Sequence, residues 1–353
     1  MKRINYYFLL TVFVSINLHS QIATNSLFIE TKSINPSIIG KRPVAVFSLT
    51  INEDRIKKDL DLSTGSFGTG AKENNIIDVK SASLFYGGKS GGFLTSEFTL
   101  KQAQGTKKVK VSSSTANFSS SNNVRNTYAQ LGYGLGRFLG LSMGLLKYHY
   151  VFKVQNDYAD FDNKSDTLVK MIKAGLNFKS LLNFGFYAEY DQIDTKLEQN
   201  SVSSEQKEKM KIIGGGIGFI QNKFHLQASY EKRLEPPPNP HGKKLKPARI
   251  IGTLEFAVSG ITLGYTGNYY IDGFIDMENV LYKSLVYGSA MEEPRLEHTF
   301  NIAFGLSKGH TFSGSLSYSN IKAEESSGLF GDGIKYPAIT KSIGVSLKYS
   351  YIF

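Results

Sequence analysis

The stretch that decides the fold is the end of the chain, residues 342–353, which read SIGVSLKYSYIF. Every second residue from Ile343 to Phe353 is apolar or aromatic, and the residues between them are glycine, serine or lysine, apart from Ile352. A period of two is that of a β-strand, whose successive side chains point to opposite faces. This segment is therefore a strand with one apolar face and one small, polar face.

The same alternation recurs upstream in segments of about 10–14 residues, a length that suits a tilted strand crossing a bilayer and is long for a soluble β-sandwich. Aromatic residues gather towards the segment ends, as they do at the two interfaces of a membrane barrel. The predicted strands are 43–52, 76–86, 92–102, 124–135, 139–154, 166–179, 181–195, 210–221, 223–234, 248–258, 260–271, 295–307, 310–321 and 339–353.

The connections between these segments alternate between short and long, with long ones such as 53–75, 103–123, 155–165 and 196–209. Short periplasmic turns and longer extracellular loops are typical of outer-membrane barrels. The sequence therefore predicts an all-β protein, a transmembrane antiparallel β-barrel of about fourteen strands with both termini in the periplasm. The alternative is a barrel of twelve strands, which would result if one weak pair of early segments does not form strands.

The composition excludes several other classes. The chain has 353 residues, 34 of them Gly, 24 Phe and 20 Tyr, and it has no Cys and a net charge of +11. Without Cys there is no disulfide framework, thiolate metal site or lipid anchor on a Cys. A mean hydropathy of −0.20 argues against a bundle of transmembrane helices.

The N-terminus resembles an export signal. Met1-Lys2-Arg3 is basic, Ile4–Ile16 is apolar but too short to span a bilayer as a helix, and Ser20 supplies a small residue for cleavage. We therefore divide the chain into a signal peptide at 1–20, a periplasmic or plug segment at 21–42, and a barrel at 43–353. The segment 21–42 either enters the lumen or hangs in the periplasm.

The C-terminus carries a second targeting signal. Tyr349, Tyr351 and the terminal Phe353 lie on one strand face, and they resemble the terminal signature that the barrel insertion machinery recognises in Gram-negative bacteria. This resemblance implies that the insertion machinery is a partner and that the chain is located in the outer membrane.

Together these features resemble the FadL family of hydrophobic-compound transporters. Asn35-Pro36-Ser37 is similar to the Asn-Pro-Ala near the start of those proteins, with Ser in place of Ala, and Asn35 and Pro36 would belong to the plug. The chain and its N-terminal segment are shorter than is typical of the family. The resemblance implies capture of hydrophobic molecules outside the cell, passage to a site in the lumen, and sideways release through a gap in the wall.

Residues 272–294 form a long connection that is unusually apolar. An apolar loop in water packs on something or receives something. We interpret it as a capture surface at the barrel mouth; the alternative is a short helix that caps the lumen for structural reasons. Its candidate ligand-binding residues are Phe274, Ile275, Val280, Leu281 and Leu285.

Polar residues should line the lumen if the alternation holds its phase, and three of them, Glu189, Arg295 and Asn301, are further candidates for ligand binding. They could equally fill the lumen with paired charges. The basic stretches 101–125 and 231–249 would contact outer-membrane lipid, through the phosphates of lipopolysaccharide, whereas export disfavours nucleic acid.

No catalytic pattern is present: the sequence contains neither HExxH nor GxSxG. We expect no enzyme activity, no metal and no cofactor. The predicted function is passive uptake of small hydrophobic molecules across the outer membrane. The alternatives are a general diffusion porin, and a structural or surface-binding barrel whose loops are its active part.

Overall fold

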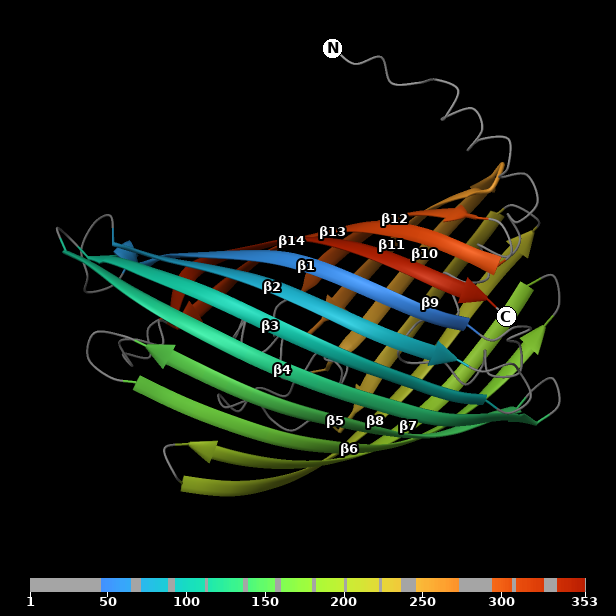
Figure 1. Ribbon diagram of the computed structural model, residues 1–353, viewed down its shortest axis with the longest axis horizontal. Coiled ribbons are helices and arrows are strands. Elements are labelled where there is room, and N and C mark those ends of the chain that lie inside the picture. Colours follow the sequence, from blue (N-terminus) through green and yellow to red (C-terminus); the bar gives the residue numbers. More distant parts are fainter. Residues whose placement is uncertain are drawn as a thin grey trace, which may run out of the picture.

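The computed structural model describes a closed antiparallel β-barrel (Figure 1). Within the described residues, no helix is long and apolar enough to cross a membrane. The residues described are 46–64, 71–87, 93–111, 114–135, 139–155, 160–179, 182–199, 202–221, 224–235, 246–272, 294–306, 309–326 and 335–352.

The described part of the chain contains fourteen strands and one short 3-10 helix, Leu62–Thr64. The strands are β1 Val46–Asp61, β2 Lys72–Gly87, β3 Phe93–Val111, β4 Ser114–Leu135, β5 Leu139–Gln155, β6 Asp160–Lys179, β7 Leu182–Gln199, β8 Val202–Gln221, β9 Phe224–Leu234, β10 Ala248–Val258, β11 Ile261–Ile271, β12 Arg295–Gly305, β13 His310–Ser326 and β14 Lys335–Ile352.

Each strand pairs with its neighbours in the sequence, and the last strand closes the barrel on the first. Val46 of β1 lies opposite Ile352 of β14 and also opposite Gly87 of β2. Closure leaves no strand edge unpaired, as a sheet in hydrocarbon requires. The predicted barrel of about fourteen strands is confirmed, and the count of twelve is wrong. We call the end where β1 begins and β14 ends the proximal end, and the opposite end the distal end.

Strand lengths divide the wall into two parts. Strands β9 to β12 have 11 residues each, which matches a single tilted membrane crossing of about 9–11 residues. Strand β4 has 22 residues, about 70 Å at about 3.3 Å per residue, and β8 has 20. The long strands therefore continue beyond a membrane at the distal end, where β1 to β4 reach the left of Figure 1.

Several predicted long loops are therefore wrong. Strand β3 ends at Val111 and β4 begins at Ser114, within the predicted loop 103–123. Strand β7 ends at Gln199 and β8 begins at Val202, within the predicted loop 196–209. In 203–209 the side chains on both faces are polar and mostly exposed, which suits a sheet that stands in water outside the membrane.

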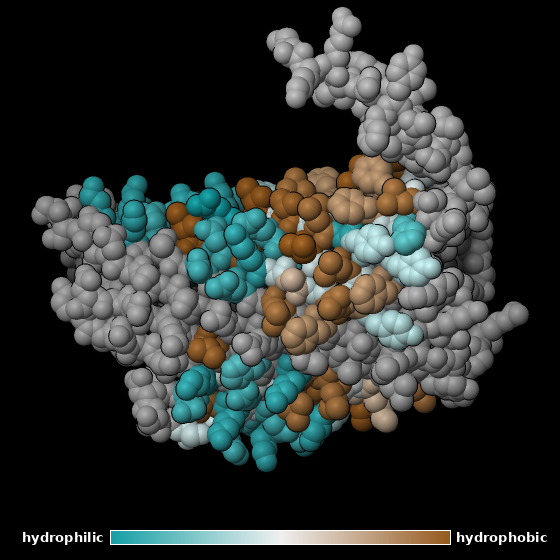
Figure 2. All heavy atoms as spheres, in the orientation of Figure 1, coloured by the Kyte–Doolittle hydropathy of each residue, from teal (hydrophilic) through white to brown (hydrophobic). Residues whose placement is uncertain are grey.

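In the proximal half, the barrel is apolar outside and polar inside. Figure 2 shows hydrophobic side chains gathered across the centre and right of the visible face, on the side where the C-terminus lies in Figure 1. Exposed outer-face residues include Phe186, Leu254, Phe300 and Val345. The inner face carries small hydroxyl residues, and those that are buried include Ser48, Ser83, Thr262, Ser313 and Ser350. We call the outer surface the apolar belt.

In the distal half the pattern reverses. On the outer face of β1 and β2, Arg55 lies 3.5 Å from Asp78, and Lys80 lies 3.7 Å from Glu53. The inner face of the same strands buries Ile56, Leu60 and Val79. The distal half thus has the polar outer face and apolar inner face of a barrel in water. It continues from a proximal half whose apolar outer face suits contact with lipid.

Candidate functional site on the inner wall

The inner wall of β5 to β8 carries several buried apolar side chains in the distal half. Leu146 lies opposite Val169, which lies opposite Ile193, so the three form one row across adjacent strands. The residues that share this surface, which we call the inner apolar patch, are Leu146, Val169, Met171, Ile193, Met210 and Ile212, and each is buried. Apolar side chains on an inner wall are what a hydrophobic solute would contact.

A second apolar cluster lies on the inner wall around β1 and β14. It contains Leu60, Leu62, Ala71, Tyr336 and Ala338, all of them buried. Ala338 lies opposite Leu60 in the register of the two strands. Apolar side chains therefore occupy two separate sectors of the distal inner wall.

Charged residues lie in the same rows as members of the inner apolar patch. Lys173 Nζ lies 3.0 Å from Glu189 Oε1, and both side chains are less than one-tenth exposed. Asp191 lies between Met171 of β6 and Met210 of β8, is fully buried, and has no hydrogen-bond partner at either carboxylate oxygen. A buried carboxylate without hydrogen bonds is costly, so Asp191 weakens this part of the wall.

A row of large polar side chains crosses from β7 to β12. The register places Tyr187 opposite Gly214, and Gly214 opposite Glu231. Glu231 lies opposite Arg249, Arg249 opposite Tyr270, and Tyr270 opposite Arg295. We call the row formed by Tyr187, Glu231, Arg249, Tyr270 and Arg295 the arginine–tyrosine row. It ends at the distal ends of β10, β11 and β12, the short strands.

The members of this row contact one another directly. Tyr187 donates its hydroxyl to Glu231, and Arg249 Nε donates to Glu231 Oε2 at 2.8 Å. The Tyr270 ring lies between two guanidinium groups, at 5.9 Å from that of Arg249 and 3.9 Å from that of Arg295. These are cation–π distances. The row therefore links β7 across β8 to β9, and β9 to β12, by side-chain contacts in addition to the backbone ladder.

Gly214 makes room for the first member of the row. A Cβ at this position would lie 2.2 Å from Cε1 of Tyr187, so the tyrosine ring lies over the glycine. Any larger residue would push the ring away and strain its hydrogen bond to Glu231. The glycine is required here for close approach rather than for its backbone angles.

The predicted site residues are distributed over the inner wall. Glu189 of β7 pairs with Lys173 of β6, whereas Arg295 contacts Tyr270 and lies five strands away from Glu189 in the sheet. Asn301 is on the same strand as Arg295 and lies opposite Gly264. The structure does not bring these three candidates into one cluster.

Other predicted positions lie outside the described residues. They are the signal peptide 1–20, the segment 21–42 with Asn35 and Pro36, the terminal Phe353, and the loop residues Phe274, Ile275, Val280, Leu281 and Leu285. Tyr349 and Tyr351 are described, and both lie on β14 next to the barrel's closing seam. In the described part of the chain, no group of three or more metal-binding side chains could hold an ion.

Sequence reasoning missed Lys173, Asp191, Arg249 and Tyr270. Arg249 was assigned to a basic stretch facing lipid, but it is buried on the inner wall against Glu231. Its partners are set by strand register, and nothing in the sequence around Arg249 indicates that register.

Comparison with solved structures agrees with the barrel geometry. A mutant of the monoaromatic hydrocarbon channel TodX matches with a TM-score of 0.60 and 11% identity, over 93% of this chain and 94% of that one. The toluene transporter TodX of Pseudomonas putida matches at 0.57, with 10% identity over 93% and 94%. A FadL homologue from Pseudomonas aeruginosa matches at 0.56, with 10% identity over 96% and 97%.

The chain has the fold of a FadL-like outer-membrane β-barrel. The resemblance seen in the sequence is thereby confirmed at the level of fold. Two of these similar structures are described as a monoaromatic hydrocarbon channel and a toluene transporter. No protein-family profile matches the sequence, and no curated protein does so either.

Proposed function

We propose that this chain is a passive outer-membrane transporter for small hydrophobic molecules, of the FadL type. The observation that carries the proposal is the inner apolar patch in the distal half of the barrel. An aqueous pore has a polar lining, whereas an apolar wall gives a hydrophobic solute a surface on which to leave water. The solved structures similar in fold include channels named for monoaromatic hydrocarbons and toluene, which supports the same class of cargo.

The size of the expected interaction suits a passage site. A solute that buries about 150 Å² of apolar surface gains about 4 kcal/mol at 25 cal/mol per Å², which corresponds to a dissociation constant of about 1 mM. Binding of this strength concentrates the solute at the wall and still lets it leave. A channel needs both properties.

The inner wall changes character along the axis. Towards the proximal end it presents hydroxyl groups, such as those of Ser48, Ser313 and Ser350. A hydrophobic molecule would lose its apolar contacts on moving further along this wall. Sideways release, which the family resemblance implies, would avoid that stretch.

Residues outside the described part complete the proposal. The apolar loop 272–294, through Phe274, Ile275, Val280, Leu281 and Leu285, would be the first capture surface. Asn35 and Pro36 would lie in the plug once residues 1–20 have directed export. Glu189, Arg295 and Asn301 would shape the polar part of the lumen, and Tyr349, Tyr351 and Phe353 would direct insertion.

A general diffusion porin is the second candidate, because the proximal inner wall is lined by serine and threonine hydroxyls. The two functions differ in what crosses the barrel. A porin gives a steady ohmic conductance in planar bilayers, whereas a hydrophobic-compound transporter takes up apolar solutes without a sustained ion current.

The test is uptake of toluene into vesicles that carry the purified barrel, with empty vesicles as the reference. Uptake faster than in empty vesicles is expected, and it should fall when Val169 and Ile193 are replaced by serine. Matched replacement of Ser317 and Ser319 by threonine should leave it unchanged. Uptake equal to that of empty vesicles, or an open ohmic pore, would contradict the proposal.

A further inference from the structure

A row of hydrogen-bond donors crosses the outer face of β6, β7 and β8 directly beyond the apolar belt. Lys170 lies opposite Gln192, and Gln192 lies opposite Lys209. Both lysines are exposed. Neighbouring strands are about 4.8 Å apart, so the two ammonium groups can approach one ligand of phosphate size from either side of the amide. We call Lys170, Gln192 and Lys209 the donor row.

The row immediately proximal to it is apolar or aromatic on β5, β6 and β7, and its position on β8 is Lys211, which pairs with Glu235. Met143 of β5 lies opposite Ile172 of β6, which lies opposite Tyr190 of β7. Their exposed fractions are 61%, 57% and 37%, so these side chains offer an open apolar surface. A tyrosine at this border is typical of the interface between hydrocarbon and head groups. The donor row is therefore placed at the level of lipid head groups.

The row immediately distal to the donor row adds two more cations. Lys147 lies opposite Leu168, Leu168 opposite Asp194, and Asp194 opposite Lys207. Asp194 lies 3.8 Å from Lys170 and is the one acid among the seven positions named in these two rows. The two rows therefore present four lysines against one carboxylate, a surface that favours anions.

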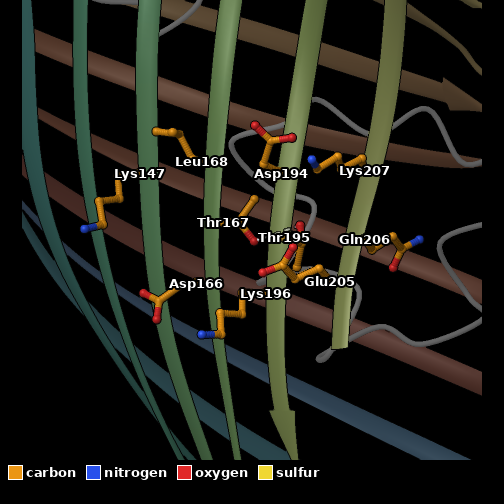
Figure 3. A pocket seen from close by; sticks show the side chains of 10 residues that line it. All are labelled: Lys147, Asp166, Thr167, Leu168, Asp194, Thr195, Lys196, Glu205, Gln206 and Lys207. Carbon is orange, nitrogen blue, oxygen red and sulfur yellow. Dashed lines mark hydrogen bonds between the residues drawn. The ribbon is translucent and has the colours of Figure 1, made fainter. Parts of the chain in front are cut away.

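A depression of about 320 Å³ lies on this part of the wall, lined by residues of β5, β6, β7 and β8 (Figure 3). Ammonium and carboxylate groups alternate around it, among them Lys147, Lys196 and Lys207 with Asp166, Asp194 and Glu205. Such a mixture of donors and acceptors can bind the hydroxyl groups of a sugar, which donate and accept hydrogen bonds at once.

We propose that the outer face of β5 to β8 binds a phosphorylated glycolipid of the outer leaflet, of the lipopolysaccharide class. The acyl chains contact the row of Met143, Ile172 and Tyr190, a phosphate binds the donor row, and a sugar occupies the depression. The order of apolar, cationic and mixed polar surfaces follows the order of acyl chain, phosphate and sugar along the membrane normal. The site lies on the outer wall, so it does not depend on the proposed transport through the lumen.

The test compares three lipids on the full chain in phosphatidylcholine nanodiscs. The probes are diphosphoryl lipid A, the same lipid with its phosphates removed, and phosphatidylglycerol, and bound lipid is counted by native mass spectrometry. Diphosphoryl lipid A is expected to bind about tenfold or more tightly than either of the others, because each lysine near the phosphate adds to the attraction.

The variant is Lys170→Gln with Lys209→Gln, which should abolish that preference. The matched control is Lys57→Gln with Lys341→Gln, another lysine pair on the outer face, on paired strands β1 and β14. It makes the same change in net charge and should keep the preference within about twofold. All four side chains are exposed, and an unchanged β-sheet circular dichroism spectrum verifies that each variant folds.

Three results would overturn the proposal. Equal binding of the dephosphorylated lipid would show that the phosphate does not contribute to binding at this site. Equal binding of phosphatidylglycerol would show that any anionic lipid suffices and that the depression does not recognise a sugar. The same loss in the control variant would show that net charge, rather than the donor row, attracts the lipid.

Discussion

Replacing Arg249 by methionine is expected to destabilise the barrel by about 3–5 kcal/mol, because it leaves a buried carboxylate without its cation. Arg249 donates to Glu231 through Nε at 2.8 Å and also through its terminal amino group. Both side chains are about one-tenth exposed. In the described part of the chain, Glu231 would keep the Tyr187 hydroxyl as its remaining partner.

The magnitude follows from burial rather than from the ion pair as such. An exposed pair contributes about 0–1 kcal/mol, and the outer-face pair Arg55 and Asp78, at 3.5 Å, is of this kind. Arg55→Met is therefore the matched control, with an expected loss below about 1 kcal/mol. The double variant Glu231→Gln with Arg249→Met removes both charges. Its free energy of unfolding should lie within about 1 kcal/mol of that of the parent.

The assay is a urea titration of the barrel folded in vesicles, followed by far-ultraviolet circular dichroism, because the chain has no Trp. The parent, Arg249→Met, Glu231→Gln and the double variant together form a double-mutant cycle. A loss below about 1 kcal/mol for Arg249→Met would refute the reasoning. So would a double variant as unstable as the single Arg249→Met.

Three further predictions concern other parts of the wall. Leu176→Lys places a charge on the outer face within the belt and should cost about 2–4 kcal/mol in vesicles, whereas Ser203→Lys beyond the belt, opposite Glu198, should change stability by less than about 0.5 kcal/mol; equal costs would contradict the assigned boundary. Gly214→Ala should cost about 1–3 kcal/mol because its Cβ meets the Tyr187 ring, and the cost should fall below about 0.5 kcal/mol when Tyr187→Val is added; an unchanged cost would refute the contact. Asp191→Leu should raise the free energy of unfolding by about 1–3 kcal/mol, since it removes a buried carboxylate without hydrogen bonds, and a loss of stability would show that Asp191 has a partner.

The membrane-crossing parts of the strands could be predicted from the sequence. The segment 248–258 matches β10 in full, and the alternation in 342–353 gives most of β14. These segments have one face in lipid and the other in a mostly polar lumen, so apolar and polar residues alternate along most of their length. Physical contrast between the two sides of the wall is what makes the period visible.

The distal extensions could not be predicted in the same way. In 203–209, SSEQKEK, both faces of β8 are polar, so no period of two remains in the sequence. In 168–172, LVKMI, apolar residues fall on both faces of β6, so the sequence alone does not say which ones point inward. The inner apolar patch therefore follows from the structure and not from the pattern.

The arginine–tyrosine row could not be predicted from the sequence for another reason. Its members are on strands joined by the long connections 235–247 and 272–294, and their meeting depends on register across each pair. Register is a property of the closed sheet. Arg295 was predicted to face the lumen from its local alternation, but its packing on Tyr270 was not predicted.

The measurement that tests the central claim most directly is a single-cysteine scan of β6, because the chain has no Cys of its own. Each position from 164 to 176 is replaced in turn and labelled with a nitroxide, and its accessibility to oxygen and to a water-soluble nickel complex is measured in vesicles. Outer positions 172, 174 and 176 should favour oxygen, and 164, 166 and 170 should favour nickel. Inner positions 169 and 171, beyond the membrane, should be shielded from nickel. Nickel access at 169 and 171 equal to that at 170 would contradict an apolar inner wall above the membrane.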